Sequence, residues 1–260
     1  MKEYVELRNG DKSDRRIFFV SKPAITAYVP GVGHHWPCIL ILPGGGFQHV
    51  AIDKEGHHIA RWLLKYDIAS AVLEYRMPQR DDKIFLPEIS SGDVKRALEL
   101  VYERATSWGL DAEKIGVMGF SAGGYLASKL SNQKDLKYRP QFQILVYPFA
   151  APFRQDTEAI RRANRQLFGP EFSRDVLEQN SPEKHINSNT PPTFIVHALD
   201  DEKVPVGHSM ALYQQLLMAS VPAEMHLYDH GGHGFAMRAL SGSLKAWPDQ
   251  LIAWLRGSVL

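Results

Sequence analysis

The sequence is poor in several features that define whole classes of protein. It contains a single cysteine, Cys38, which excludes an intrachain disulfide. Because Cys38 lies in the apolar run 38–42, we interpret it as a buried thiol rather than a nucleophile. The net charge of +1 gives no electrostatic reason to expect nucleic acid or an anionic membrane surface as a partner.

Long hydrophobic stretches are also missing. No run approaches the roughly 18 apolar residues of a membrane-spanning helix, and the start, Met1–Arg8, has no apolar signal-peptide core. We therefore expect a soluble cytoplasmic protein, although a leader removed earlier would leave no trace. Repeats and low-complexity segments are absent as well.

The length and composition are typical of one globular domain. The chain has 260 residues, of which 44% are hydrophobic and 23% charged, enough to bury a sizeable core. Apolar runs of strand length alternate with segments of helical periodicity. Strands are expected at 15–20, 24–29, 38–42, 68–75, 115–118, 142–148, 194–199 and 223–228, and helices at 53–66, 89–108, 125–130, 205–217 and 244–256.

This alternation predicts an α/β fold: a mostly parallel sheet with helices on both faces and an antiparallel edge at the N-terminal end. The pattern loosens in segment 150–190, where Gly169-Pro170 and Ser181-Pro182 break the chain. We interpret this segment as a helical cap inserted over the site, rather than a peripheral decoration. The charged run 161–165 is interpreted as a solvated helix face.

The sequence around Ser121 carries the strongest chemical signal. The apolar run 115–118 leads into Gly119-Phe120-Ser121-Ala122-Gly123, after which a helical pattern begins. Strand, Gly-x-Ser-x-Gly and helix in this order are typical of a nucleophile elbow, whose sharp turn exposes the serine hydroxyl at the edge of a sheet. The alternative is a glycine-rich turn that serves packing alone.

A serine nucleophile needs a histidine to take its proton and a carboxylate to orient that histidine. Asp200 and Asp201 follow one predicted strand, and His230 and His233 follow another, in the order Ser, Asp, His. The residues alone leave open which aspartate and which histidine act. The other nine histidines have no such context and are interpreted as surface or core residues.

The negative oxygen of a tetrahedral intermediate needs hydrogen-bond donors. The amide of Ala122, which follows the nucleophile, is one candidate, and the run Gly44-Gly45-Gly46 after an earlier strand can supply others. A phosphate-binding turn is the alternative for this run, but neither a P-loop nor a dinucleotide motif continues from it.

These motifs resemble the α/β-hydrolase superfamily, and within it the small acetylxylan-type carbohydrate esterases close to the hormone-sensitive-lipase-like branch. The motifs that carry the resemblance are Pro43-Gly44-Gly45-Gly46-Phe47, Glu74-Tyr75-Arg76, Gly119–Gly124, Asp201-Glu202-Lys203-Val204-Pro205 and Gly232-His233-Gly234-Phe235. The family pattern selects Asp201 and His233. Pro43 stands where lipase-like relatives have histidine, which favours the carbohydrate esterases.

The resemblance implies a serine carboxylester hydrolase that removes short acyl groups, above all acetyl, from a sugar or oligosaccharide. Ser121, Asp201 and His233 would form the catalytic triad, and the amides of Gly45, Gly46 and Ala122 the oxyanion hole. Phe47, His49 and Tyr125 are expected to bind substrate.

No metal or organic cofactor is expected for this chemistry. A homodimer is compatible with the expectation, although no motif supports it. The alternatives are a general short-chain or lipase-like esterase, a lactonase, a small serine peptidase and a non-enzymatic binding module, the last disfavoured because every triad member is present.

Overall fold

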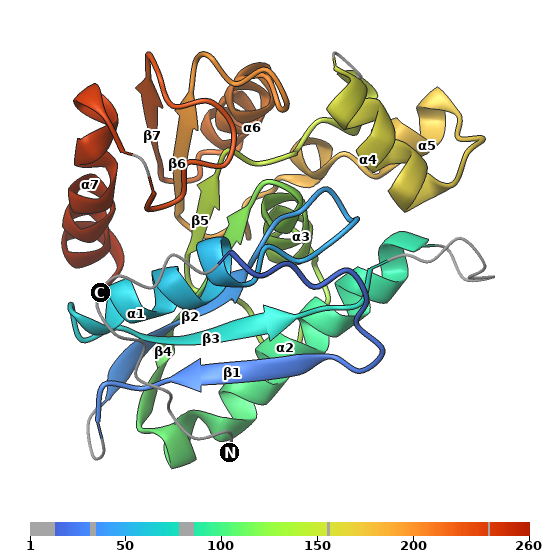
Figure 1. Ribbon diagram of the computed structural model, residues 1–260. Coiled ribbons are helices and arrows are strands. Elements are labelled where there is room, and N and C mark those ends of the chain that lie inside the picture. Colours follow the sequence, from blue (N-terminus) through green and yellow to red (C-terminus); the bar gives the residue numbers. More distant parts are fainter. Residues whose placement is uncertain (1–13, 32–34, 78–85, 155–156, 239) are drawn as a thin grey trace.

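A central sheet organises the protein. The computed structural model describes residues 14–31, 35–77, 86–154, 157–238 and 240–260, and within them seven strands lie in the order β1-β3-β2-β4-β5-β6-β7 (Figure 1). The strands are β1 (Ala24–Tyr28), β2 (Trp36–Leu42), β3 (Ala69–Glu74), β4 (Leu110–Phe120), β5 (Gln143–Val146), β6 (Thr193–Ala198) and β7 (Ala223–Tyr228). β1 pairs antiparallel to β3, and all other pairs are parallel. The predicted sheet and its antiparallel edge are confirmed.

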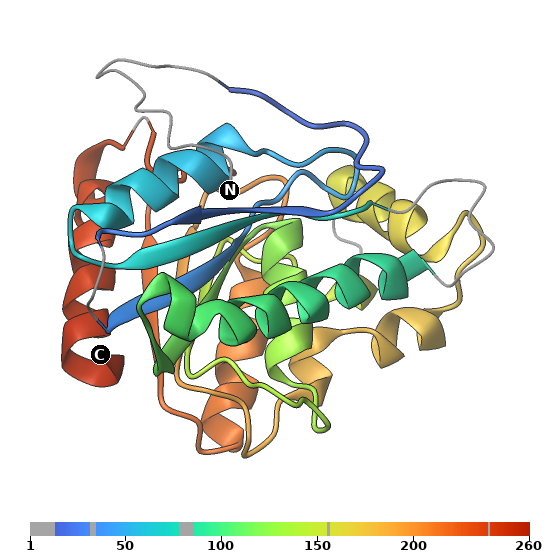
Figure 2. The same ribbon diagram turned by 90° about the horizontal axis from the view of Figure 1, so that it is seen from below.

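Helices cover both faces of this sheet. They are α1 (His58–Leu64), which continues the π-helical turn Asp53–His57, α2 (Leu86–Trp108), α3 (Ala122–Ser131), α6 (Gly207–Met218) and α7 (Trp247–Trp254). Figure 2 shows α1 and α2 on opposite faces of the sheet. Residues 38–42 of β2 and all of β5 are buried, as continuous apolar strands between two helical layers must be. No helix within the described residues is long and apolar enough to cross a membrane.

The segment between β5 and β6 is helical, as expected for 150–190. It contains the 3₁₀ turns Pro152–Arg154 and Pro182–His185 and the helices α4 (Glu158–Phe168) and α5 (Arg174–Gln179), which stand at one end of the molecule (Figure 1). The run 161–165 lies on α4, and only part of it is a solvated face. Arg161 and Arg165 form ion pairs with Glu158 at the surface, whereas Ala163 and Asn164 are buried.

The predicted strand at 15–20 is wrong. This segment forms a single antiparallel bridge, in which Ile17 and Val50 exchange two backbone hydrogen bonds of 3.0 and 2.9 Å. Its neighbour is the loop after β2 rather than a strand, so no ladder can continue, and Phe18 and Phe19 remain exposed. The N-terminal stretch Met1–Arg8 lies outside the described residues.

Candidate active site

Ser121 occupies the turn between β4 and α3. Its backbone has φ 50° and ψ −115°, a conformation that costs a residue with a side chain about 1–3 kcal/mol. Backbone hydrogen bonds hold it there: Ser121 N donates to Val146 O at 3.0 Å, and Phe149 N donates to Ser121 O at 3.0 Å. The turn is therefore fixed by the neighbouring strand β5, and the structure has the nucleophile-elbow geometry that the sequence predicted.

Asp201 follows β6 and is buried. Its Oδ1 accepts the backbone amides of Lys203 and Val204, both at 2.9 Å, and its Oδ2 accepts from His233 Nδ1 at 2.7 Å. Burial alone would raise the pKa of Asp201, but the hydrogen bonds from His197, His233 and Val204 together hold it well below its usual value. The carboxylate is therefore charged throughout the neutral pH range.

His233 lies in the loop after β7 and joins Asp201 to Ser121. Its Nε2 is 2.8 Å from Ser121 Oγ. Because Asp201 is ionised, Nδ1 donates to the carboxylate, which leaves Nε2 as the acceptor for the serine hydroxyl. Gly232 and Gly234 flank the histidine with φ values of 60° and 82°, which is the left-handed conformation that glycine adopts without strain.

Asp200 and His230 occupy different places from their neighbours Asp201 and His233. Asp200 Oδ1 accepts the amides of Gly231 and Gly232 at 2.9 and 2.7 Å, and so holds the backbone of the histidine loop. His230 is exposed and lies 3.1 Å from the carboxylate of Asp229. The two adjacent aspartates thus have different roles: Asp200 holds the loop backbone, and Asp201 contacts the imidazole of His233.

The glycine loop after β2 approaches the serine from the other side. Gly45 and Gly46 have φ values of 133° and 63°, and both line the pocket together with Ser121 and Ala122. In the part of the chain that the structure describes, the amides of Gly45, Gly46 and Ala122 donate no hydrogen bond. They are therefore available as oxyanion donors.

Two side chains anchor the base of this loop. Tyr75 of the Glu-Tyr-Arg motif donates its hydroxyl to Pro43 O at 2.7 Å. Glu55 accepts the amide of Gly44 at 2.8 Å, so this amide is not available to a substrate.

Glu55 was missed by the sequence reasoning, which assigned segment 53–66 to a helix without chemistry. It is buried in the π-helical turn, and its second oxygen accepts the hydroxyl of Tyr147 at 3.0 Å. Burial and the adjacent Glu55 raise the pKa of Tyr147 well above its usual value, so this hydroxyl remains a donor. Nothing in the local pattern Asp-Lys-Glu-Gly-His distinguishes this glutamate from a surface residue.

His197 is a core histidine, which agrees with its interpretation as a surface or core residue, but it also contacts the carboxylate of the site. Its ring is fully buried on β6, where Nε2 lies 3.1 Å from Asp201 Oδ2 and 2.9 Å from Val204 O. Nδ1 lies 2.7 Å from the hydroxyl of Ser209. His197 thus helps to fix the Asp201 carboxylate through Oδ2, the same oxygen that His233 contacts. The only available signal was its position four residues before Asp201.

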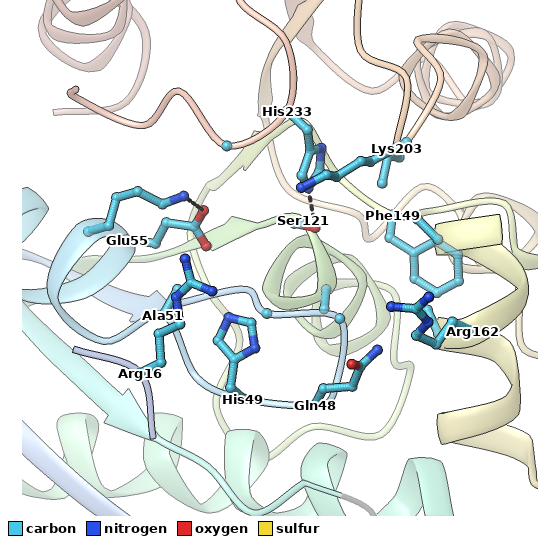
Figure 3. A pocket seen from close by; sticks show the side chains of 18 of the residues that line it. Arg16, Gln48, His49, Ala51, Glu55, Ser121, Phe149, Arg162, Lys203 and His233 are labelled. Atoms are coloured by element: carbon cyan, nitrogen blue, oxygen red, sulfur yellow. Dashed lines mark hydrogen bonds and ion pairs between the residues drawn. The ribbon is translucent and has the colours of Figure 1, made fainter. Parts of the chain in front are cut away.

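A pocket of about 290 Å³ opens above Ser121. Figure 3 shows Ser121 and His233 at its centre, with the loop that carries Gln48 and His49 on one side and α4 on the other. Ala159, Ile160, Arg162 and Ala163 of α4 line it. The volume lies near the lower end of the roughly 300–1,000 Å³ that ligand pockets span.

Of the three predicted substrate-binding residues, only His49 lines this pocket. The predictions for Phe47 and Tyr125 are wrong, because both side chains are fully buried. They pack against each other with ring centres 5.8 Å apart, and Phe149 packs on both and is the aromatic side chain that faces the pocket. Burial lowers the pKa of His49, and the nearby Arg16 lowers it further, so His49 is neutral. Among the described residues, no group of three or more His, Cys, Asp or Glu side chains could hold a metal ion.

The parallel sheet, the elbow and the Ser–His–Asp arrangement define an α/β-hydrolase. Residues 27–216 match the BD-FAE family model, and the chain belongs to this family.

Named relatives agree with this assignment. The chain is 32% identical over 226 residues to the acetylxylan esterase of Xylanibacter ruminicola, a match that covers 84% of this chain and 45% of that protein. It is 28% identical to endo-1,4-beta-xylanase B of Butyrivibrio fibrisolvens, over 83% of this chain and 35% of that protein. The chain thus spans half or less of the length of these curated relatives.

A solved structure covers nearly the whole chain. The acetyl ester-xyloside bifunctional hydrolase of Caldicellulosiruptor lactoaceticus superposes with a TM-score of 0.82 at 30% identity, over 90% of this chain and 87% of that one.

Proposed function

We propose that this chain is a serine carboxylester hydrolase that removes acetyl groups from a sugar or oligosaccharide. The observation that carries the proposal is the continuous relay from Ser121 Oγ through His233 to Asp201, with hydrogen bonds of 2.8 and 2.7 Å. The relatives named for acetylxylan esterase and acetyl ester hydrolase activity support the substrate class. The small ester enters the pocket above Ser121.

The first half of the reaction acylates the enzyme. Ser121 Oγ attacks the carbonyl carbon of the ester while its proton moves to His233 Nε2. The developing oxyanion lies against the free amides of Gly45, Gly46 and Ala122. Asp201 stabilises the imidazolium through Nδ1. The tetrahedral intermediate then collapses, the C–O bond to the sugar breaks, and His233 gives its proton to the departing alcohol oxygen.

The second half releases the acid. A water molecule takes the place of the alcohol, and His233 Nε2 accepts its proton as the oxygen attacks the acyl carbon. Collapse of the second tetrahedral intermediate breaks the bond to Ser121 Oγ, which recovers its proton from His233. Acetate leaves, and the resting hydrogen bonds are restored.

The test compares 4-nitrophenyl acetate, butyrate and octanoate with an acetylated xylo-oligosaccharide. We expect acetate release from the sugar and activity that falls steeply by octanoate, as for an esterase of the acetylxylan type that this chain resembles. Ser121→Ala should reduce turnover by at least about 10⁴-fold without unfolding the protein. Strong octanoate turnover with an intact acetylated sugar would instead identify a general esterase.

A further inference from the structure

The walls of the pocket carry an excess of positive charge. Its lining includes the cationic side chains of Arg16, Lys54, Arg162 and Lys203, against the carboxylates of only Asp14 and Glu55. Two of the cations are paired: Arg16 lies 3.5 Å from Asp14, and Lys54 lies 3.6 Å from Glu55.

Arg162 and Lys203 are the other two cations of the pocket lining. Neither forms an ion pair within the described residues. Both side chains are exposed at the mouth of the pocket, and Figure 3 shows both charged ends directed inward, Arg162 beside Phe149 and Lys203 towards Ser121 and His233.

Hydrogen bonds join the two backbone segments that carry Arg162 and Lys203. Thr157 caps α4, since its Oγ1 accepts the amide of Ile160 at 3.2 Å, and the same hydroxyl donates to Lys203 O at 2.7 Å. The amide of Lys203 in turn donates to Asp201. The start of α4 and the loop of the catalytic acid are thereby joined, so the backbone positions of Arg162 and Lys203 are fixed relative to each other and to the site.

The position of these cations indicates which part of an ester substrate they would contact. The acyl group is consumed at Ser121, in the interior of the pocket, whereas the mouth faces the alcohol part. A neutral sugar would offer these cations only hydroxyl oxygens. A carboxylate would also compensate their positive charge through short N⁺–H···O⁻ hydrogen bonds. Arginine in particular binds carboxylates with two parallel hydrogen bonds.

We propose that the alcohol part of the substrate is an acidic sugar, a uronic-acid-containing oligosaccharide whose carboxylate binds between Arg162 and Lys203. This inference rests on the proposed acetyl-sugar esterase function and narrows its substrate class. Asp14 and Glu55 do not oppose it, because each already has a cation of its own.

The experiment uses two substrates that differ only in this charge: an acetylated xylo-oligosaccharide bearing one glucuronic acid, and the same compound with that carboxyl group converted to the amide. Acetate release gives kcat/KM for each. We expect the acid to be preferred at least about tenfold in low salt, which corresponds to about 1.4 kcal/mol. The preference should shrink in 0.5 M NaCl, because exposed charges are screened.

Variants test whether Arg162 and Lys203 cause the preference for the acidic substrate. In the double variant Arg162→Gln with Lys203→Gln, the ratio of the two kcat/KM values should fall towards one. Arg165→Gln is the matched control, because Arg165 lies on the same helix, pairs with Glu158 and does not line the pocket. This control should keep the ratio of the unmodified protein.

The possible results distinguish the acidic-sugar proposal from the acetyl-sugar esterase function on which it rests. Equal kcat/KM values for acid and amide, with acetate released from both, would overturn the acidic-sugar proposal and leave the esterase function standing. A preference that survives in the double variant would also overturn it. Failure to deacetylate either sugar, while 4-nitrophenyl acetate is still cleaved, would contradict both.

Discussion

At the scale of single residues, Glu55 connects the glycine loop to the rest of the site. One of its oxygens accepts the Gly44 amide and the other accepts the Tyr147 hydroxyl. Removing the side chain would leave a buried amide without a partner, at a cost of about 1–3 kcal/mol, and would release the loop that carries the Gly45 and Gly46 amides. Glu55 is thus a positioning residue in our proposed mechanism.

We therefore expect Glu55→Ala to lower kcat for 4-nitrophenyl acetate roughly ten- to hundredfold with little change in KM. The loss should be smaller than the 10²–10³ that removal of an oxyanion donor itself causes. Glu55→Gln should recover most of the activity, because its amide can accept from Gly44 and donate to Tyr147. Steady-state kinetics with a thermal melt of each variant checks this, and an alanine variant with unchanged kcat would refute the assignment.

At the scale of elements, the elbow depends on how closely β2, β4 and α3 approach. A Cβ atom on Gly123 would lie 2.0 Å from Leu42 O, and one on Gly119 would lie 2.3 Å from Gly123 O. Both contacts are with backbone, so no side-chain movement can relieve them. The glycines of the motif are therefore required by packing as much as by the turn.

Gly123→Ala is expected to lower the free energy of unfolding by at least about 3 kcal/mol, the upper end of the usual cost of overpacking. Gly92→Ala is the matched control on α2, where an added Cβ meets nothing within 4 Å. Because Gly92 is exposed in a helix, alanine there should raise stability by about 1 kcal/mol. Urea unfolding measures both, and similar values for the two variants would contradict the packing argument.

Elements also show why the sequence predicts some of the site and not the rest. The elbow and the loops of Asp201 and His233 are encoded locally, by turn residues that follow apolar strands, and their order along the chain matches their order in the sheet. The contacts of Glu55 arise between distant elements and leave no local pattern. His197 contacts residues that are near in the chain, but its spacing from Asp201 alone does not predict that the buried ring turns towards the carboxylate. The same reason explains the error at 15–20, where strand-like residues face a loop.

Whether an aromatic residue near the site faces substrate is also a tertiary property. Phe47 and Tyr125 adjoin the glycine loop and the elbow in sequence, yet their rings turn inward to pack with Phe149. Phe149 itself was not singled out, because it follows β5, a strand whose end carries no catalytic motif.

At the scale of the whole molecule, all parts of the proposed site come from loops at one edge of a single sheet. They follow β2, β4, β6 and β7, with α4 closing one side. The chain spans less than half of the length of the two curated relatives described above. All the loops that form the proposed site lie within this chain. The catalytic relay therefore depends on the stability of this one sheet and its helices.

That stability should fall in mild acid because of two buried histidines. Burial lowers the pKa of His57 to about 4 and that of His208 to about 3, from an ordinary value near 6.5 in the unfolded chain. Below about pH 6.5 the unfolded chain binds protons that the folded protein does not. Stability is therefore lost as pH falls towards 4, by up to about 1.4 kcal/mol per pH unit for each histidine. Asp201, whose folded pKa is depressed, keeps its contribution in this window and loses it only in stronger acid.

Urea unfolding at pH 7.5, 6.0 and 5.0 measures this loss. His208→Asn removes the titrating ring but retains an acceptor for the amides of Ala150 and Ala151, which His208 Nδ1 accepts at 3.2 and 2.9 Å. Its stability should therefore fall less steeply with pH. Gly92→Ala provides the control, because it changes no titrating group and should leave the slope unchanged. Burial raises the pKa of Glu183 to about 7, so this carboxyl adds stability as pH falls through the same window. The test is therefore the difference between slopes, and an equal slope for His208→Asn and the unmodified protein would contradict the role of His208.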